Sequence, residues 1–103
     1  MTLDERDAGS SIEIGSGDVF AVRLKENAST GYRWAIDSAT GLETGNDRTE
    51  AGAAPGGAGL REFQFRALQP GNFELRLKNW REWQGDAGVI DRFVVHVRVA
   101  PAA

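Results

Sequence analysis

A chain of 103 residues holds one domain and leaves no room for a second hydrophobic core. Its hydrophobic fraction of 41% is near the globular norm and excludes global disorder, while its net charge of −3, with scattered Lys and Arg, argues against a nucleic-acid partner. The absence of cysteine excludes disulfides, zinc–thiolate sites and thiol nucleophiles together.

The N-terminal residues are polar and precede the first apolar pattern. We expect residues 1–11 to form a disordered tail and residues 12–100 to form a single domain. No apolar run approaches the roughly 20 residues that cross a bilayer, so we expect no membrane partner. No signal peptide is visible, and we therefore expect either a protein that stays in the cytoplasm or a chain that begins after a removed leader.

A period of two dominates the rest of the chain and predicts strands with one buried and one solvated face. Phe20, Val22 and Leu24, for example, alternate with polar or small residues. The predicted strands are 12–14, 18–25, 32–37, 42–50, 60–67, 72–79 and 90–99. Turn-forming residues separate these short runs, and the pattern predicts an all-β fold, an antiparallel immunoglobulin-like β-sandwich of about seven strands.

The order of the strands predicts which loops lie together. Successive antiparallel strands reverse direction, so the connections 26–31, 51–59 and 80–89 fall at one end of the sandwich, provided that 42–50 is a strand. These three loops are longer than the turns at the other end and are richer in glycine and aromatic residues. Function concentrates in loops on a rigid scaffold, so this end is the candidate site.

Each of these loops carries a distinctive run of residues. The first reads Asn27-Ala28-Ser29-Thr30-Gly31-Tyr32-Arg33-Trp34. The second contains Pro55-Gly56-Gly57 among small residues, ahead of a strand. The third reads Asn79-Trp80-Arg81-Glu82-Trp83.

In this order, the three runs resemble the chagasin family of inhibitors of papain-like cysteine proteases. That family carries an Asn-Pro-Thr-Thr-Gly-aromatic-x-Trp loop, a glycine-rich loop and an Arg-Pro-Trp loop, and the resemblance extends from about Ile12 to Val99. It implies a reversible, competitive inhibitor that is not an enzyme, needs no cofactor or metal, and inserts the three loops into the cleft of a papain-family protease. It also favours a periplasmic or secreted location, and we expect a monomer.

The resemblance also implies a role for each loop. Ser29 and Thr30 would lie beside the catalytic cysteine and histidine, the glycine-rich loop would follow the non-primed subsites, and Trp83 would stack on an aromatic wall of the primed side. Arg81 would support Trp83 or pair with a carboxylate. The implied protease-binding residues are Asn27, Ala28, Ser29, Thr30, Gly31, Tyr32, Pro55, Gly56, Gly57, Arg81 and Trp83.

Three positions depart from the family pattern. Ala28 and Glu82 stand where the family has proline, and Ser29 stands for its first threonine. The missing prolines should make the first and third loops more flexible and raise the cost of ordering them on binding. Glu82 also adds a negative charge near the contact surface.

Other readings of the conspicuous residues remain open at this point. Trp34 is in phase with Tyr32 and predicts a core residue, whereas His96, the single histidine, lies on the polar phase of the last strand and predicts a solvated surface residue. Trp80 and Trp83 could instead stack on sugar rings, so a carbohydrate- or protein-binding module without protease inhibition is the alternative function. A hydrolase has no nucleophile–base pair to support it.

Overall fold

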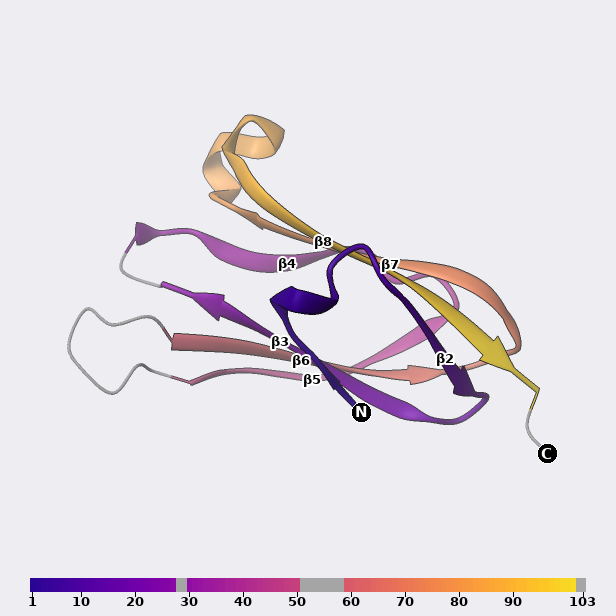
Figure 1. Ribbon diagram of the computed structural model, residues 1–103. Coiled ribbons are helices and arrows are strands. Elements are labelled where there is room, and N and C mark those ends of the chain that lie inside the picture. The colour runs from indigo at the N-terminus through magenta and orange to yellow at the C-terminus, as the bar shows by residue number, and fades with distance from the viewer. Residues whose placement is uncertain (28–29, 51–58, 102–103) are drawn as a thin grey trace.

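The computed structural model describes residues 1–27, 30–50 and 59–101, which form two four-stranded sheets (Figure 1). One sheet has the order β1-β3-β6-β5, with the bounds Thr2–Leu3, Val19–Glu26, Gly59–Ala67 and Leu42–Glu50. The other has the order β2-β8-β7-β4, with the bounds Ser11–Gly15, Val89–Ala100, Gly71–Trp80 and Arg33–Ser38. The predicted all-β, immunoglobulin-like sandwich is confirmed, with eight strands rather than seven among the described residues.

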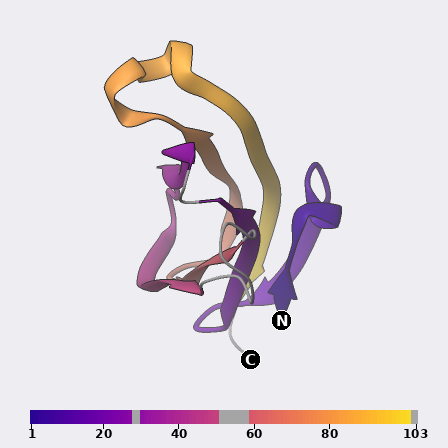
Figure 2. The ribbon, with the colours of Figure 1, turned by 90° about the vertical axis from the view of Figure 1, so that its left-hand side faces the viewer.

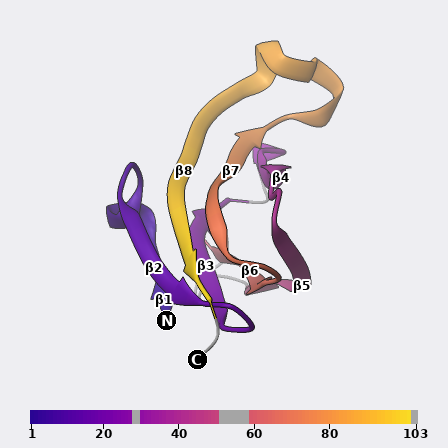
Figure 3. The same cartoon turned by 90° about the vertical axis from the view of Figure 1, so that its right-hand side faces the viewer.

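The long strands pair antiparallel, whereas the two short N-terminal strands pair in parallel. β1 lies beside β3, and β2 lies beside β8. Figure 3 shows β2, β8 and β7 of one sheet side by side. Two 3-10 helices, η1 (Glu5–Asp7) and η3 (Glu82–Gly88), lie wholly within the described residues, and neither is long and apolar enough to cross a membrane.

The core fills the space between the sheets with the apolar residues that alternate along each strand. Phe20 and Phe65 face each other in the register of β3 and β6, with ring centroids 5.4 Å apart. Trp34 is buried as predicted, and its indole Nε1–H donates to the Lys25 carbonyl at 2.9 Å. The other large buried side chains include Val22, Leu24, Phe63, Leu75, Leu77, Phe93, Val95 and Val97.

The N-terminal segment is docked on the sandwich, whereas the sequence predicts a disordered tail over residues 1–11. Leu3 in β1 is only 4% exposed and belongs to the core. Glu5 Oε1 accepts a hydrogen bond from the Lys25 amide at 2.7 Å, and the Gly9 amide donates to the Val94 carbonyl at 2.7 Å. Period-two analysis misses this segment because a single apolar residue in a polar stretch generates no alternation.

Asp4 begins η1 and completes a capping box with Asp7. The Asp4 carboxylate accepts hydrogen bonds from the Arg6 backbone amide at 2.9 Å and from the Arg6 guanidinium at 2.9 Å. Together these bonds hold the pKa of the Asp4 carboxyl below its usual range, and the side-chain bond has the larger effect. The capping interaction is therefore present at neutral pH and is lost only as the pH falls through that lowered pKa.

Replacing Leu3 with alanine should lower the free energy of unfolding by about 2 kcal/mol, because the change leaves a cavity beside β3. Chemical denaturation followed by tryptophan fluorescence measures this loss. Thr2→Ala is the matched control, since Thr2 is exposed in the same strand and should change stability by less than about 0.5 kcal/mol. Equal stability of the two variants would contradict the docking of β1.

β5 forms an edge of its sheet and is almost wholly exposed beyond Leu42. Its register with β6 shifts between Thr44 and Asp47, which marks a bulge or irregularity. Charged side chains follow the shift: Arg48 Nε donates to Glu62 Oε2 at 2.7 Å, and Arg61 Nη2 donates to Asp47 Oδ2 at 2.9 Å. The predicted strand 42–50, the weakest in the sequence, is thus confirmed over the same bounds.

Candidate functional site

The strand registers bring the ends of the three long connections together. Glu26, the last residue of β3, pairs with Gly59, the first residue of β6, and Glu50 at the end of β5 pairs with Leu60. In the other sheet Arg33 at the start of β4 pairs with Trp80 at the end of β7. Figure 2 faces this end of the sandwich. The predicted clustering of the three connections is therefore confirmed for the residues that flank them.

The first loop closes on itself through Thr30. The Thr30 hydroxyl donates to the Asn27 carbonyl at 2.8 Å, and the Thr30 amide donates to the same oxygen at 3.3 Å. The hydroxyl oxygen in turn accepts from the Tyr32 amide at 3.4 Å. Thr30 is exposed, and Gly31 after it has a φ of 80°, a left-handed conformation that favours glycine.

The third loop folds into η3, and Arg81 occupies its N-cap position. The Gln84 amide donates to the Arg81 carbonyl at 3.0 Å, and Gly85, with a φ of 60° and ψ of −149°, breaks the segment into two short turns. Trp83 projects from the first of these turns with 73% of its surface exposed. An indole this exposed on a hydrogen-bonded turn is a candidate contact for a partner protein.

Arg81 joins the third loop to the first. Its Nε and Nη2 donate to the Thr30 carbonyl at 3.2 and 3.0 Å, and its guanidinium carbon lies 4.2 Å from the centroid of the Tyr32 ring. Trp83 also approaches the first loop, because a Cβ added to Gly31 would meet Trp83 Cη2 at 2.8 Å. The two loops therefore form one continuous surface, which we call the loop end (residues 27, 30–32 and 81–83).

A groove of about 430 Å³ lies beside the loop end. Its lining combines aromatic side chains with charges of both signs, and includes Gly31, Arg33, Arg61, Trp80, Glu82 and Trp83. Trp80 is half-buried, and Lys78 Nζ lies 3.7 Å from its ring centroid. Among the described residues, no group of three or more His, Asp or Glu side chains could hold a metal ion. The surface can therefore contact a partner through its groove, its exposed backbone groups and its aromatic side chains.

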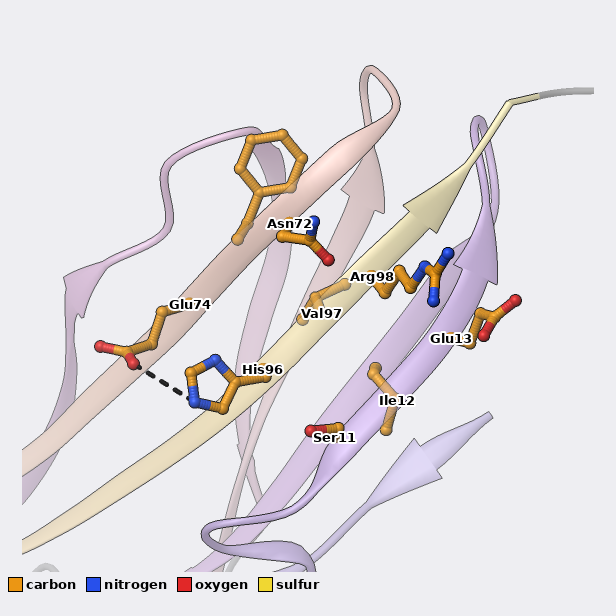
Figure 4. A pocket seen from close by; sticks show the side chains of 9 residues that line it. Ser11, Ile12, Glu13, Asn72, Glu74, His96, Val97 and Arg98 are labelled. Carbon is orange, nitrogen blue, oxygen red and sulfur yellow. Dashed lines mark ion pairs between the residues drawn. The ribbon is translucent and has the colours of Figure 1, made fainter.

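His96 lies on a different surface, the outer face of β2, β8 and β7 (Figure 4). This face is hollowed by about 590 Å³ and is lined by polar side chains such as Asn72 and Arg98. The His96 side chain is 62% exposed, and its Nε2 lies 3.6 Å from Glu74 Oε2. The prediction of a solvated histidine on the polar phase of the last strand is confirmed.

The loop end brings together all six of the predicted site residues that the structure describes. Asn27, Thr30, Gly31, Tyr32, Arg81 and Trp83 are neighbours there. Five further predicted residues lie outside the described residues, namely Ala28, Ser29, Pro55, Gly56 and Gly57. The sequence interpretation missed Glu26 and Arg61, which lie beneath the loops. The sequence did contain a sign of them, because each is a charged residue at a position where the alternation of its strand predicts an apolar one.

Comparisons with known proteins identify the class of molecule to which this surface belongs. The model of the family described as chagasin family peptidase inhibitor I42 matches residues 13–97. The chain therefore belongs to the chagasin family of peptidase inhibitors. Amoebiasin-2 of Entamoeba histolytica is 29% identical over 87 residues, which cover 80% of this chain and 71% of that protein.

Solved structures agree with this assignment. The cysteine protease inhibitor EhICP2 from Entamoeba histolytica matches with a TM-score of 0.87 at 25% identity, over 96% of this chain and 94% of that one. PbICP-C, solved in complex with falcipain-2, shares the fold with a TM-score of 0.71 at 13% identity, over 96% and 98%. The predictions of family, of a cysteine protease inhibitor and of a protein that is not an enzyme are confirmed.

Proposed function

We propose that this protein inhibits papain-like cysteine proteases reversibly and competitively by inserting its three clustered loops into the active-site cleft. One observation carries the proposal: two hydrogen bonds from Arg81 to the Thr30 carbonyl hold the first loop beside the exposed Trp83. A protruding polar turn and an aromatic anchor are thereby presented side by side. No covalent step is needed, since tight complementary contact alone blocks the cleft.

Each part of the loop end has a chemical role in this proposal. The first loop, with Ser29 and Thr30, approaches the catalytic cysteine and histidine and offers hydroxyl and backbone groups for hydrogen bonds. The loop with Pro55, Gly56 and Gly57 pairs through its main chain with the non-primed subsites, as an extended substrate does. Trp83 packs on the primed side, where a large aromatic side chain contributes most of its energy when water is excluded.

The Arg81 contacts also bear on the two missing prolines. Ala28 and Glu82 leave the first and third loops without rings that restrict their backbones. The guanidinium fork, which spans from η3 to the Thr30 carbonyl and covers the Tyr32 ring, ties the loops together instead. A fork of fixed geometry loses little freedom for each hydrogen bond formed, so it can pre-organise the surface before binding.

The carbohydrate-binding alternative finds less support in the arrangement of the tryptophans. A sugar platform needs neighbouring rings that are both open to the ligand, and Trp83 is exposed whereas Trp80 is half-buried beneath Lys78. The close fit of Trp83 against Gly31 further directs that ring toward the first loop. These contacts favour recognition of a protein surface.

Titration of papain and cathepsin L with the purified protein tests the proposal. Residual hydrolysis of a fluorogenic peptide should fall with inhibitor concentration, substrate should compete with the inhibitor, and activity should return on dilution. His96→Ala provides a matched control, because His96 lies on the outer face away from the loop end and should leave inhibition unchanged. Full activity of both proteases at micromolar inhibitor would contradict the proposed function.

A further inference from the structure

Two charged side chains occupy inward-facing positions beneath the loop end. Glu26 continues the buried face of β3 that begins with Phe20, and Arg61 precedes Phe63 on the buried face of β6. The Glu26 side chain is 2% exposed and that of Arg61 is 16% exposed. An unpaired buried carboxylate is costly, so these residues require partners where apolar residues would need none.

Their partners lie at the bases of the loops. Glu26 Oε1 accepts a hydrogen bond from the Trp34 amide at 2.7 Å, and Glu26 Oε2 lies 3.8 Å from Arg61 Nη1. Arg61 extends the network, since its Nη2 donates to Asp47 Oδ2 at 2.9 Å and its guanidinium carbon lies 5.1 Å from the Phe63 ring centroid. The network therefore connects β3, β4, β5 and β6.

The positions of these contacts in the chain matter more than their number. Glu26 ends β3 and Trp34 is the second residue of β4, so the 2.7 Å hydrogen bond joins the two stems of the first loop. Arg61 is the third residue of β6 and lies just after the second loop. The ion pair thus links the base of the first loop to the base of the second.

Stability alone does not explain this arrangement. A buried ion pair gains little over well-packed apolar residues of similar volume, because desolvation offsets most of the attraction. The two residues do impose direction, since the hydrogen bonds of Glu26 with the Trp34 amide and of Arg61 with Asp47 are each met in one geometry only. An apolar pair would fill the same space without fixing how one loop stem lies against the other.

We propose that Glu26 and Arg61 are positioning residues for the loop end. They hold the stems of the first and second loops in the binding arrangement before the protease arrives, without contacting the protease themselves. This role rests on the proposed function, and it supplies at the base of the first loop a restraint that a proline at position 28 would supply within that loop.

Glu26→Ala removes both the acceptor of the Trp34 amide and the partner of Arg61, whereas Glu26→Gln keeps an acceptor oxygen and removes the charge. We expect Glu26→Ala to raise the inhibition constant for papain about tenfold, and Glu26→Gln to raise it less. Arg61→Met should resemble Glu26→Ala, and Arg61→Lys should recover part of the loss.

Glu62→Gln is the matched control. Glu62 is also a buried glutamate in the same sheet, but it lies on the outer phase of β6 and pairs with Arg48 and Arg23. Its substitution should lower the thermal unfolding midpoint about as much as Glu26→Gln does and leave the inhibition constant unchanged.

A second readout needs no protease. In Glu26→Ala, backbone ¹⁵N order parameters of Thr30 and Tyr32 should fall below about 0.6, while those of Val95 in the core stay at wild-type values. Unchanged order parameters at Thr30 and Tyr32, or a rise in the inhibition constant no larger than that of Glu62→Gln, would overturn the positioning role. If the wild-type protein inhibits no papain-like protease, the proposed function fails, and the order parameters decide the positioning role on their own.

Discussion

Replacing Trp83 with alanine is expected to raise the inhibition constant for papain about a hundredfold, or about 3 kcal/mol of binding free energy. Trp83 is 73% exposed in the free protein and has the largest apolar surface available at the loop end. Burying Trp83 against a partner should therefore contribute the most binding free energy, whereas removing it should lower the stability of the free protein only slightly. Competitive inhibition assays over a range of inhibitor concentrations measure the effect.

Two controls separate this contact from general hydrophobicity. Leu68→Ala removes an exposed apolar side chain at the opposite end of the sandwich and should leave inhibition unchanged. Trp83→Phe keeps an aromatic ring and should recover part of the affinity. If Trp83→Ala and Leu68→Ala inhibit equally well, Trp83 is not the anchor of the interface.

Gly31→Ala should raise the inhibition constant about thirtyfold, for two physical reasons that act together. Gly31 has a φ of 80°, where alanine is strained, and its new Cβ would meet Trp83 Cη2 at 2.8 Å. The indole must move away, and the first loop must adjust beneath it. Titration of papain measures the loss of inhibition, and denaturation should show a decrease of about 1 kcal/mol in stability.

Gly9→Ala isolates the part of this effect that comes from backbone strain. Gly9 has a φ of 81°, nearly that of Gly31, but no atom lies within 4 Å of its added Cβ. Both variants should therefore lose similar stability, while Gly9→Ala keeps full inhibition. Similar inhibition by the two variants would show that the contact between Gly31 and Trp83 has no part in binding.

Strands β3, β6, β7 and β8 were predictable because each one buries a single face against the opposite sheet. Burial of Phe20, Val22 and Leu24 imposes the alternation that the sequence displays, and β3 begins and ends within one residue of the predicted bounds. The position of the loop end followed from strand order once 42–50 was taken as a strand. The prediction of a strand at 42–50 is correct because β5 pairs with β6 despite its polar composition.

Features that depend on single contacts were not predictable in this way. Leu3 is the buried apolar residue of β1, and one residue has no period. The link from Arg81 to the Thr30 carbonyl joins positions 51 residues apart, and a backbone acceptor leaves no mark in the sequence. The Glu26–Arg61 pair is visible in the sequence, since each charge interrupts an apolar face. Only the structure, however, identifies the partners of these residues.

The exposed edge of β5 has a consequence for how copies of this protein meet one another. An unpaired strand edge offers amide and carbonyl groups to a second chain and favours joining of sheets into larger aggregates. In β5 the register shift between Thr44 and Asp47 interrupts that line of groups, and the exposed Glu43, Asp47 and Arg48 would bring charges against an incoming copy. The edge of β5 therefore disfavours the joining of two copies into one continuous sheet along this strand.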